Sequence, residues 1–185
     1  MNLIVSAPSG SGKTTILKKI FELYPDKFGF SVSATTRTPR QGEVNGKDYY
    51  FLSAEEFNKR IEASDFLEYE QVYDNLFYGT LKSEIDRING EGRYPVFDVD
   101  VKGGVNIKKT LGDKAYSIFI MPPSVEVLKH RLVNRGTETE ETLNKRIQRA
   151  EMEISYAKFF DKIIVNDDLA TAVKEFSKAV EKYIL

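Results

Sequence analysis

The residues with the clearest chemical potential lie near the start of the chain, in the segment Ala7–Thr15. An apolar run at 3–5 precedes this glycine-rich segment, and apolar residues at helical spacing follow it. A strand, a glycine-rich turn and a helix in this order are typical of a phosphate-binding loop, in which backbone N–H groups surround phosphate oxygens. Lys13 adds a mobile positive charge, and the hydroxyl of Thr14 suits a magnesium ion. We therefore predict a nucleoside triphosphate site made by Ala7, Pro8, Ser9, Gly10, Ser11, Gly12, Lys13, Thr14 and Thr15.

This segment departs from the usual pattern, G-x-x-x-x-G-K-[ST], at one position, where Ala7 replaces the first glycine. A Gly/Ser-rich surface turn is the alternative explanation. The strand pattern before the segment and the helical pattern after it favour the phosphate-binding loop.

A polar, turn-rich segment at 35–48 carries a second group of candidates. Arg37 and Arg40 lie three positions apart, and Tyr49 follows. Two guanidinium groups can hold one phosphate dianion through paired hydrogen bonds, which lysine does less well. Two incidental arginines on a solvated loop are the alternative. Beside a triphosphate site, this segment indicates a site for the phosphate of an acceptor.

Glu68 lies in a predicted strand, and Tyr78 and Thr80 follow in the next one. A carboxylate accepts hydrogen bonds and does not donate them. Guanine offers two adjacent N–H donors on its Watson–Crick edge, whereas adenine has an acceptor there. A buried Glu68 would therefore select guanine, and Thr80 could donate to O6. A solvent-facing glutamate is the alternative.

Two acids, Asp98 and Asp100, end a hydrophobic run at 94–101. An acid at the end of a strand beside a phosphate-binding loop typically holds magnesium or its water. We predict a magnesium site at Thr14 and Asp98, the latter through water, although the sequence leaves open whether Asp98 or Asp100 serves the metal. Helix capping before Gly103 is the alternative role.

Four arginines bracket an acidic segment: Arg131, Arg135, Arg146 and Arg149. In a phosphoryl transferase, arginines that close over the triphosphate exclude water and neutralise charge in the transition state. A solvated face is the alternative for each, and we expect at least one of the four to have that role. The single histidine, His130, is expected at the surface without a role.

The composition suits a single domain with small inserted parts. The chain has 185 residues, a net charge of −1 and no cysteine. This balance gives no overall attraction to nucleic acid or to an anionic membrane, and it excludes a disulfide framework and a thiol nucleophile. No apolar run approaches membrane-spanning length, and the first residues enter a strand pattern at once. We expect a cytoplasmic protein.

Strand and helix patterns alternate along most of the chain, which predicts an α/β fold with a parallel sheet covered on both faces. Alternating apolar residues predict one strand over 28–34. Residues 33–81 differ, because they read as a small, mostly β insert with a capping box at Ser53 and Glu56. The buried face of the first helix is predicted to hold Ile16, Leu17, Ile20 and Leu23.

Taken together, these motifs resemble the guanylate kinase family over essentially the full chain. The matching segments are 9–14, 33–40, 42–43, 46, 49, 68, 78–80, 98–103, 135–139 and 164–167. The resemblance implies transfer of a phosphoryl group from ATP to GMP or dGMP, with Mg²⁺ accompanying ATP. It also implies a P-loop core at 1–32, 82–123 and 151–185, a GMP-binding insert at 33–81 and a helical lid at 124–150.

Carried over position by position, the resemblance implies a role for each candidate. The GMP phosphate would be held by Ser33, Arg37, Arg40, Tyr49 and Tyr78, and the guanine would be read by Glu68, Thr80 and Asp100. On the ATP side, the loop would be joined by Arg131, Arg135 and Asn166. The groups acting on the transferring phosphoryl would be Lys13, Arg37, Arg135 and Arg146. We expect a monomer or a weak homodimer.

Two other functions remain open from the sequence. One is a P-loop kinase that acts on a different small phosphorylated acceptor. The other is a phosphopeptide-binding module, since domains that resemble guanylate kinase can serve that purpose in scaffold proteins.

Overall fold

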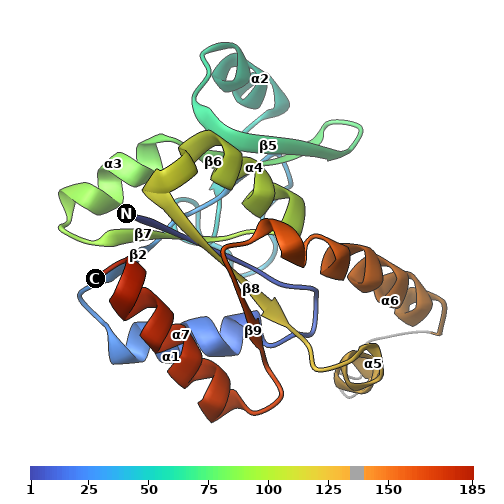
Figure 1. Cartoon of the computed structure of the whole chain (residues 1–185). Helices are drawn as coiled ribbons and strands as arrows, with labels where there is room; N and C mark the ends of the chain where they lie inside the picture. Colours follow the sequence, from blue (N-terminus) through green and yellow to red (C-terminus); the bar gives the residue numbers. More distant parts are fainter. Residues whose placement is uncertain (134–139) are drawn as a thin grey trace.

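A five-stranded parallel sheet lies at the centre of the molecule (Figure 1). The computed structural model describes residues 1–133 and 140–185. The predicted α/β fold, a parallel sheet flanked by helices, is confirmed. In the order in which they lie in the sheet, the strands are β2 (Phe28–Phe30), β7 (Tyr94–Asp98), β1 (Asn2–Ser6), β8 (Ala115–Met121) and β9 (Lys162–Val165).

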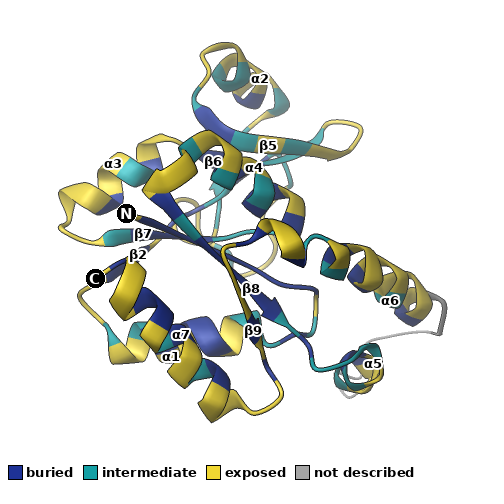
Figure 2. Cartoon of the chain, viewed as in Figure 1, coloured by how far each residue is buried: buried dark blue, intermediate teal, exposed yellow. Residues whose placement is uncertain are grey.

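Helices cover both faces of this sheet, which explains why the run at 3–5 is apolar without interruption. Side chains alternate between the faces of a strand. Leu3 and Val5 pack with the first and last helices, whereas Ile4 packs on the opposite face. Figure 2 shows the central strands β1 and β8 buried between the layers. The helices of the two layers are α1 (Lys13–Leu23) and α7 (Leu169–Tyr183) on one face, and α3 (Ser83–Gly90) and α4 (Val101–Leu111) on the other.

A second, smaller sheet lies beside the first and has its own core. Phe57 stacks on Phe66 with ring centroids 4.4 Å apart, and on Phe77 at 5.2 Å. The predicted capping box of Ser53 and Glu56 is confirmed at the start of the helix that carries Phe57. The elements, in sheet order, are β4 (Tyr50–Phe51), β3 (Ala34–Thr35), β6 (Leu76–Leu81) and β5 (Phe66–Tyr73), with α2 (Ala54–Glu62) packed against them.

The predicted single strand over 28–34 is wrong, because β2 and β3 belong to different sheets. The backbone N–H of Val32 donates to Glu84 Oε2 at 2.7 Å and so is not available to a strand partner. Phe30, one of the alternating apolar residues of this predicted strand, is 44% exposed at the end of β2. Leu23 is likewise 57% exposed, since it is the last residue of α1.

The remaining helices form a hairpin with a small apolar core of its own. This hairpin consists of α5 (Val125–Val133) and α6 (Glu140–Ser155), and α6 continues without a break past residue 150. The core residues are Leu128, Leu132, Leu143, Ile147 and Ala150. Two short 3₁₀ turns, Gly112–Lys114 and Ala157–Phe159, complete the fold. Within the described residues, no helix combines the length and the apolarity needed to cross a bilayer.

Candidate active site

The predicted phosphate-binding loop connects the carboxyl end of β1 to the first turn of α1. Gly10 and Gly12 have φ values of 92° and 90°, which strongly favour glycine. A side chain at Gly12 would also collide with the amide of Asn166. That buried amide donates to the carbonyl of Ser11 at 2.7 Å, so Asn166 holds the loop from behind. Its predicted position near the adenine stays a prediction.

A cavity of about 500 Å³ lies over this loop. Lys13 and Thr14 line it, as does Asp98 from the end of β7. Of the predicted loop residues, buried Ser11 and exposed Thr15 are the ones that do not line it. The cavity is otherwise lined by Ala7, Pro8, Ser9, Gly10, Gly12, Val99, Asp100, Arg146, Arg149 and Glu153.

Lys13 is held at the wall of this cavity by the strand beside it. Its Nζ donates to the carbonyl of Val99 at 3.0 Å and lies 2.5 Å from Asp98 Oδ1. The hydroxyl of Thr14 and the carboxylate of Asp98 give two hard oxygen donors on one cavity, which fits Mg²⁺. This ion usually takes one or two protein oxygens and completes its shell with water and phosphate.

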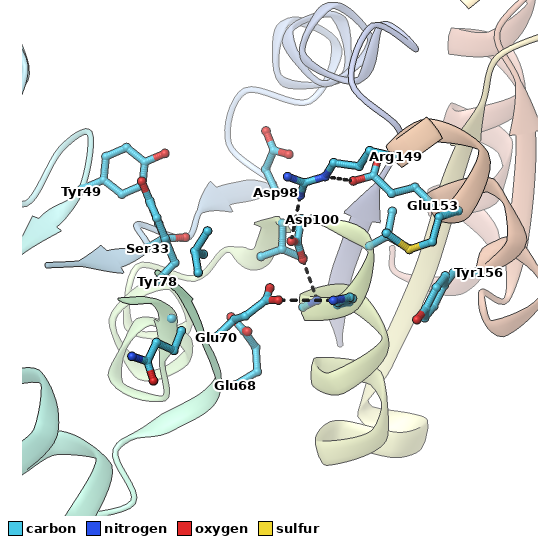
Figure 3. A pocket seen from close by; sticks show the side chains of 18 residues that line it. Ser33, Tyr49, Glu68, Glu70, Tyr78, Asp98, Asp100, Arg149, Glu153 and Tyr156 are labelled. Carbon is cyan, nitrogen blue, oxygen red and sulfur yellow. Dashed lines mark hydrogen bonds and ion pairs between the residues drawn. The ribbon is translucent and has the colours of Figure 1, made fainter. Parts of the chain in front are cut away.

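A second cavity, of about 560 Å³, adjoins the first, and Figure 3 shows the side chains that line it. It brings together five of the eight residues predicted for the acceptor: Ser33, Tyr49, Glu68, Tyr78 and Asp100. The two cavities share a wall, which consists of Asp98, Val99, Asp100, Arg149 and Glu153. A ligand in one cavity can therefore approach a ligand in the other.

Glu68 projects into this second cavity from β5. Its cross-strand neighbour on β6 is Thr80, whose hydroxyl donates to Glu68 Oε1 at 2.8 Å. Burial raises the pKa of Glu68 to about 7, and the nearby carboxylates of Asp100 and Glu70 add to the rise. Since the Thr80 hydroxyl is directed at Glu68, its predicted donation to guanine O6 would require this bond to break.

Arg37 lies beside the second cavity, above the ring of Tyr49, with its guanidinium carbon 5.3 Å from the ring centroid. Its Nη1 and Nη2 donate to both oxygens of Glu43, at 2.9 and 2.8 Å. These bonds hold the pKa of Glu43 at about 2. Nη1 also donates to the carbonyl of Thr38 at 2.8 Å, and the hydroxyl of Tyr78 lies beside the guanidinium.

Glu43 thus holds the segment that carries Arg37 and Arg40, a role that the sequence reasoning did not give it. It also accepts the backbone N–H of Arg40 at 2.6 Å. The side chain of Arg40 is exposed and lines neither cavity.

Asp100 has the capping role that the sequence offered as an alternative. Its Oδ1 accepts the backbone N–H of Gly103 at 2.8 Å, which caps α4. Its other oxygen lies 3.7 Å from Nη2 of Arg149. The carboxylate nevertheless lines both cavities, so capping does not remove it from the site.

The predicted arginines of the helical hairpin differ in whether they line a cavity. Arg131 donates to the carbonyl of Asn166 at 2.9 Å and lines neither cavity. Arg146 lines the loop cavity. Arg135 lies outside the described residues. Arg149, which the carried-over assignment omitted, lines both cavities, and His130 is exposed as expected.

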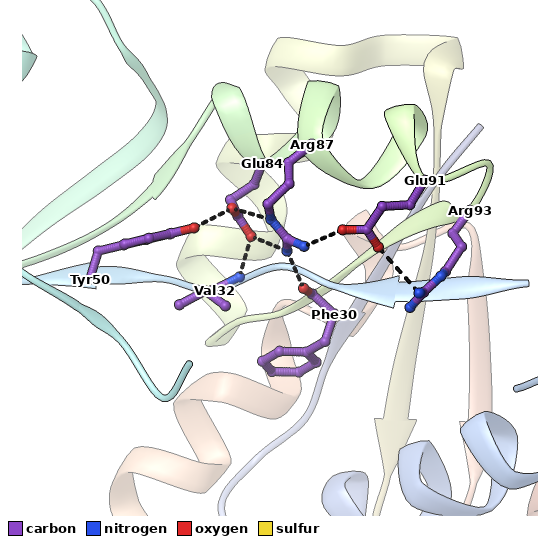
Figure 4. Close-up of polar contacts among 7 residues, drawn as sticks. All are labelled: Phe30, Val32, Tyr50, Glu84, Arg87, Glu91 and Arg93. Atoms are coloured by element: carbon purple, nitrogen blue, oxygen red, sulfur yellow. Dashed lines mark hydrogen bonds and ion pairs between the residues drawn. The ribbon is translucent and has the colours of Figure 1, made fainter. Parts of the chain in front are cut away.

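A buried carboxylate that the sequence reasoning missed joins the smaller sheet to the core (Figure 4). Glu84 accepts hydrogen bonds from Val32 N, from the Tyr50 hydroxyl at 2.8 Å, and from two nitrogens of Arg87 at 2.8 Å. Although burial opposes it, these bonds keep the pKa of Glu84 below its ordinary value. The spacing of Glu84 and Arg87 on a predicted helix was the available signal.

Comparisons with known proteins decide the family. The family model described as guanylate kinase matches residues 1–183. The chain belongs to the guanylate kinase family. It is 52% identical to the guanylate kinase of Porphyromonas gingivalis over 182 residues, which cover 98% of this chain and 97% of the relative. It is 48% identical to that of Salinibacter ruber over 183 residues, which cover 98% and 96%.

A solved structure agrees with this membership. The crystal structure of guanylate kinase from Anaplasma phagocytophilum matches with a TM-score of 0.72 and 28% identity, covering all of this chain and 87% of that one. The SH3-kinase fragment of tight junction protein 3 matches with a TM-score of 0.51 and 12% identity, covering 98% of this chain and 56% of that one. The second likeness concerns the fold alone.

Proposed function

We propose that this chain transfers the γ-phosphoryl group of ATP to GMP or dGMP, giving ADP and GDP or dGDP. The observation that carries this proposal is the shared wall between the two cavities. The phosphate-binding loop lines one cavity, and five of the eight residues predicted for GMP line the other. Membership of the guanylate kinase family gives the reaction.

On the donor side, the loop amides and Lys13 would bind the ATP phosphates. Arg146 lines the same cavity and would neutralise charge there, together with Arg135. Mg²⁺ bound near Thr14 and Asp98 would offset charge on the β- and γ-phosphates.

On the acceptor side, Arg37 would bind the GMP phosphate beside Tyr49 and Tyr78. Glu68 would accept the N1–H and N2–H groups of guanine, which requires its ionised form. With adenine the carboxylate would face an acceptor, and a buried polar mismatch of this kind supports discrimination on the order of 10⁴-fold.

The transfer itself needs no covalent intermediate with the protein. A phosphate oxygen of GMP forms a bond to the γ-phosphorus as the bond to the β–γ bridging oxygen breaks, and ADP keeps that electron pair. The attacking phosphate is a dianion and has no proton to lose. The protein supplies position and positive charge, and binding of both substrates would draw the insert and the helical hairpin toward the core.

An ADP-release assay with ATP, magnesium and each nucleoside monophosphate in turn tests the proposal. We expect turnover with GMP and dGMP and little with AMP, CMP or UMP. A Lys13→Met variant should lose nearly all turnover, and normal turnover would contradict the donor assignment. Turnover with another acceptor only would overturn the base assignment, and tight GMP binding without turnover would instead support a binding module. Light scattering tests the proposed monomer or weak homodimer.

A further inference from the structure

Arg149 lies on α6 at the junction of the two cavities (Figure 3). Among the lysine and arginine side chains that the structure describes, it is the one that lines both of them. Lys13 and Arg146 line only the loop cavity, and Lys102 lines only the acceptor cavity.

Glu153, one turn further along α6, sets the direction of this guanidinium. Nε of Arg149 donates to Glu153 Oε1 at 2.8 Å, and the side chain of Glu153 is only 10% exposed. Because the Nε side is held in this way, Nη1 and Nη2 face the junction. Neither has a hydrogen bond among the described residues, and the carboxylate oxygen Oδ2 of Asp100 lies 3.7 Å from Nη2.

Negative charge is concentrated at this junction. Three carboxylates, those of Asp98, Asp100 and Glu153, stand on the shared wall. The phosphates of a donor and an acceptor would bring further negative charge to the same place. A contact at 3.7 Å with a side chain that is 61% exposed is weak, so a phosphate oxygen can replace Asp100 at little cost.

We propose that Arg149 is a further catalytic residue, whose Nη1 and Nη2 bind phosphate oxygens between the donor and acceptor sites while Glu153 holds its Nε. The inference rests on the proposed phosphoryl transfer. Because the guanidinium of Arg149 would contact both ligands, it should stabilise the complex that contains both phosphates more than the complex with either nucleotide alone.

The first arm of the test is kinetic. We expect Arg149→Gln to lower kcat about 100-fold, the usual cost of losing one preorganised charge stabiliser. The KM values for ATP and GMP should change by less than about threefold, since a transition-state contact affects kcat more than substrate binding. Arg149→Lys should recover little of the loss. Lysine has a single side-chain nitrogen, which cannot keep the contact with Glu153 and also present a planar pair of donors to phosphate.

The second arm measures binding without turnover. The probe is adenosine joined to guanosine through five phosphates, whose chain must cross the junction. Arg149→Gln should weaken this compound at least about tenfold more than it weakens ATP or GMP, whereas Arg93→Gln, a matched change far from the site, should weaken none of them. Glu153→Gln, which keeps the positive charge, should give a smaller loss of kcat than Arg149→Gln.

The outcomes separate the two proposals. A wild-type protein that does not phosphorylate GMP overturns the proposed function. Wild-type turnover with normal kcat in Arg149→Gln overturns the role of Arg149 alone. A lowered melting temperature with equal weakening of all three ligands, restored by Arg149→Lys, would also overturn it, because that pattern is expected of a residue that only fastens α6 to α4.

Discussion

Replacing Glu68 by glutamine should stabilise the ligand-free protein at alkaline pH while it removes the preference for guanine. The pKa of Glu68 is about 7, compared with an ordinary 4.5, because the carboxyl is buried beside Asp100 and Glu70. Above pH 7 the folded protein therefore carries a buried charge that the unfolded chain carries in water. Glutamine can still accept the hydrogen bond of Thr80, and it has no charge to bury.

The size of the effect follows from the two pKa values. The gap between 4.5 and about 7 corresponds to about 3 kcal/mol, at about 1.4 kcal/mol for each pH unit. The sign is that of a raised carboxyl pKa: the folded state binds the proton more tightly, so the contribution to stability is complete below pH 4.5. It is lost as the pH rises through 7. Local rearrangement reduces the penalty, and we expect Glu68→Gln to gain about 1–3 kcal/mol at pH 8 and almost nothing at pH 4.5.

Urea unfolding of wild-type and Glu68→Gln proteins at several pH values measures this gain. Glu55→Gln is the matched control, since Glu55 pairs with Lys59 at 2.7 Å on α2, is 78% exposed and lines neither cavity. The same preparations should show kcat/KM for GMP lowered at least about 100-fold in Glu68→Gln, because the amide cannot accept both guanine donors. In the wild-type protein, GMP binding should weaken as the pH falls below 7. A Glu68→Gln protein that is no more stable at pH 8, or whose gain is the same at pH 4.5, would refute the buried-charge argument.

Three further substitutions test other parts of the structure. Glu84→Gln should destabilise the fold by on the order of 3 kcal/mol in thermal or urea unfolding, since it leaves Arg87 without its buried partner. An unchanged stability would contradict the role of Glu84 in joining the smaller sheet to the core. Glu43→Gln should raise KM for GMP about tenfold with KM for ATP unchanged, because Arg37 loses the bidentate bond that orients it; equal effects on both KM values would point to a general loss of structure. Gly12→Ala should abolish ATP binding in a calorimetric titration, since the site requires φ 90° and has no room for a side chain; retained binding would contradict the geometry of the loop.

The fold was largely predictable because its signals are local. The loop glycines, the capping box at Ser53 and the apolar runs of β1 and β8 each depend on residues close in sequence. The break between β2 and β3 was not predictable in this way. It depends on Glu84, some fifty residues away, whose carboxylate takes the N–H of Val32.

The candidate site was predictable in its residue types but less so in its pairings. The sequence indicated Arg37 and Glu68 as binding groups; Glu68 lines the second cavity, and Arg37 lies beside it over the ring of Tyr49. It did not indicate that Thr80 would donate to Glu68, because this contact depends on strand register. Nor did it separate Arg149 from the other arginines, since only the position of α6 relative to both cavities does so.

Several cations of the site share one arrangement that bears on substrate binding. Lys13 pairs with Asp98, and Nη2 of Arg149 lies 3.7 Å from Asp100 Oδ2. Without such partners, the positive charges gathered around the cleft would repel one another and destabilise the fold. Each partner is itself an anion, so an incoming phosphate can take its place on the same donors. Substrate binding then becomes an exchange of carboxylate for phosphate, whose free energy is the difference between two charged contacts. This exchange favours ligands that satisfy several cations at once, which is the situation when ATP and GMP are bound together.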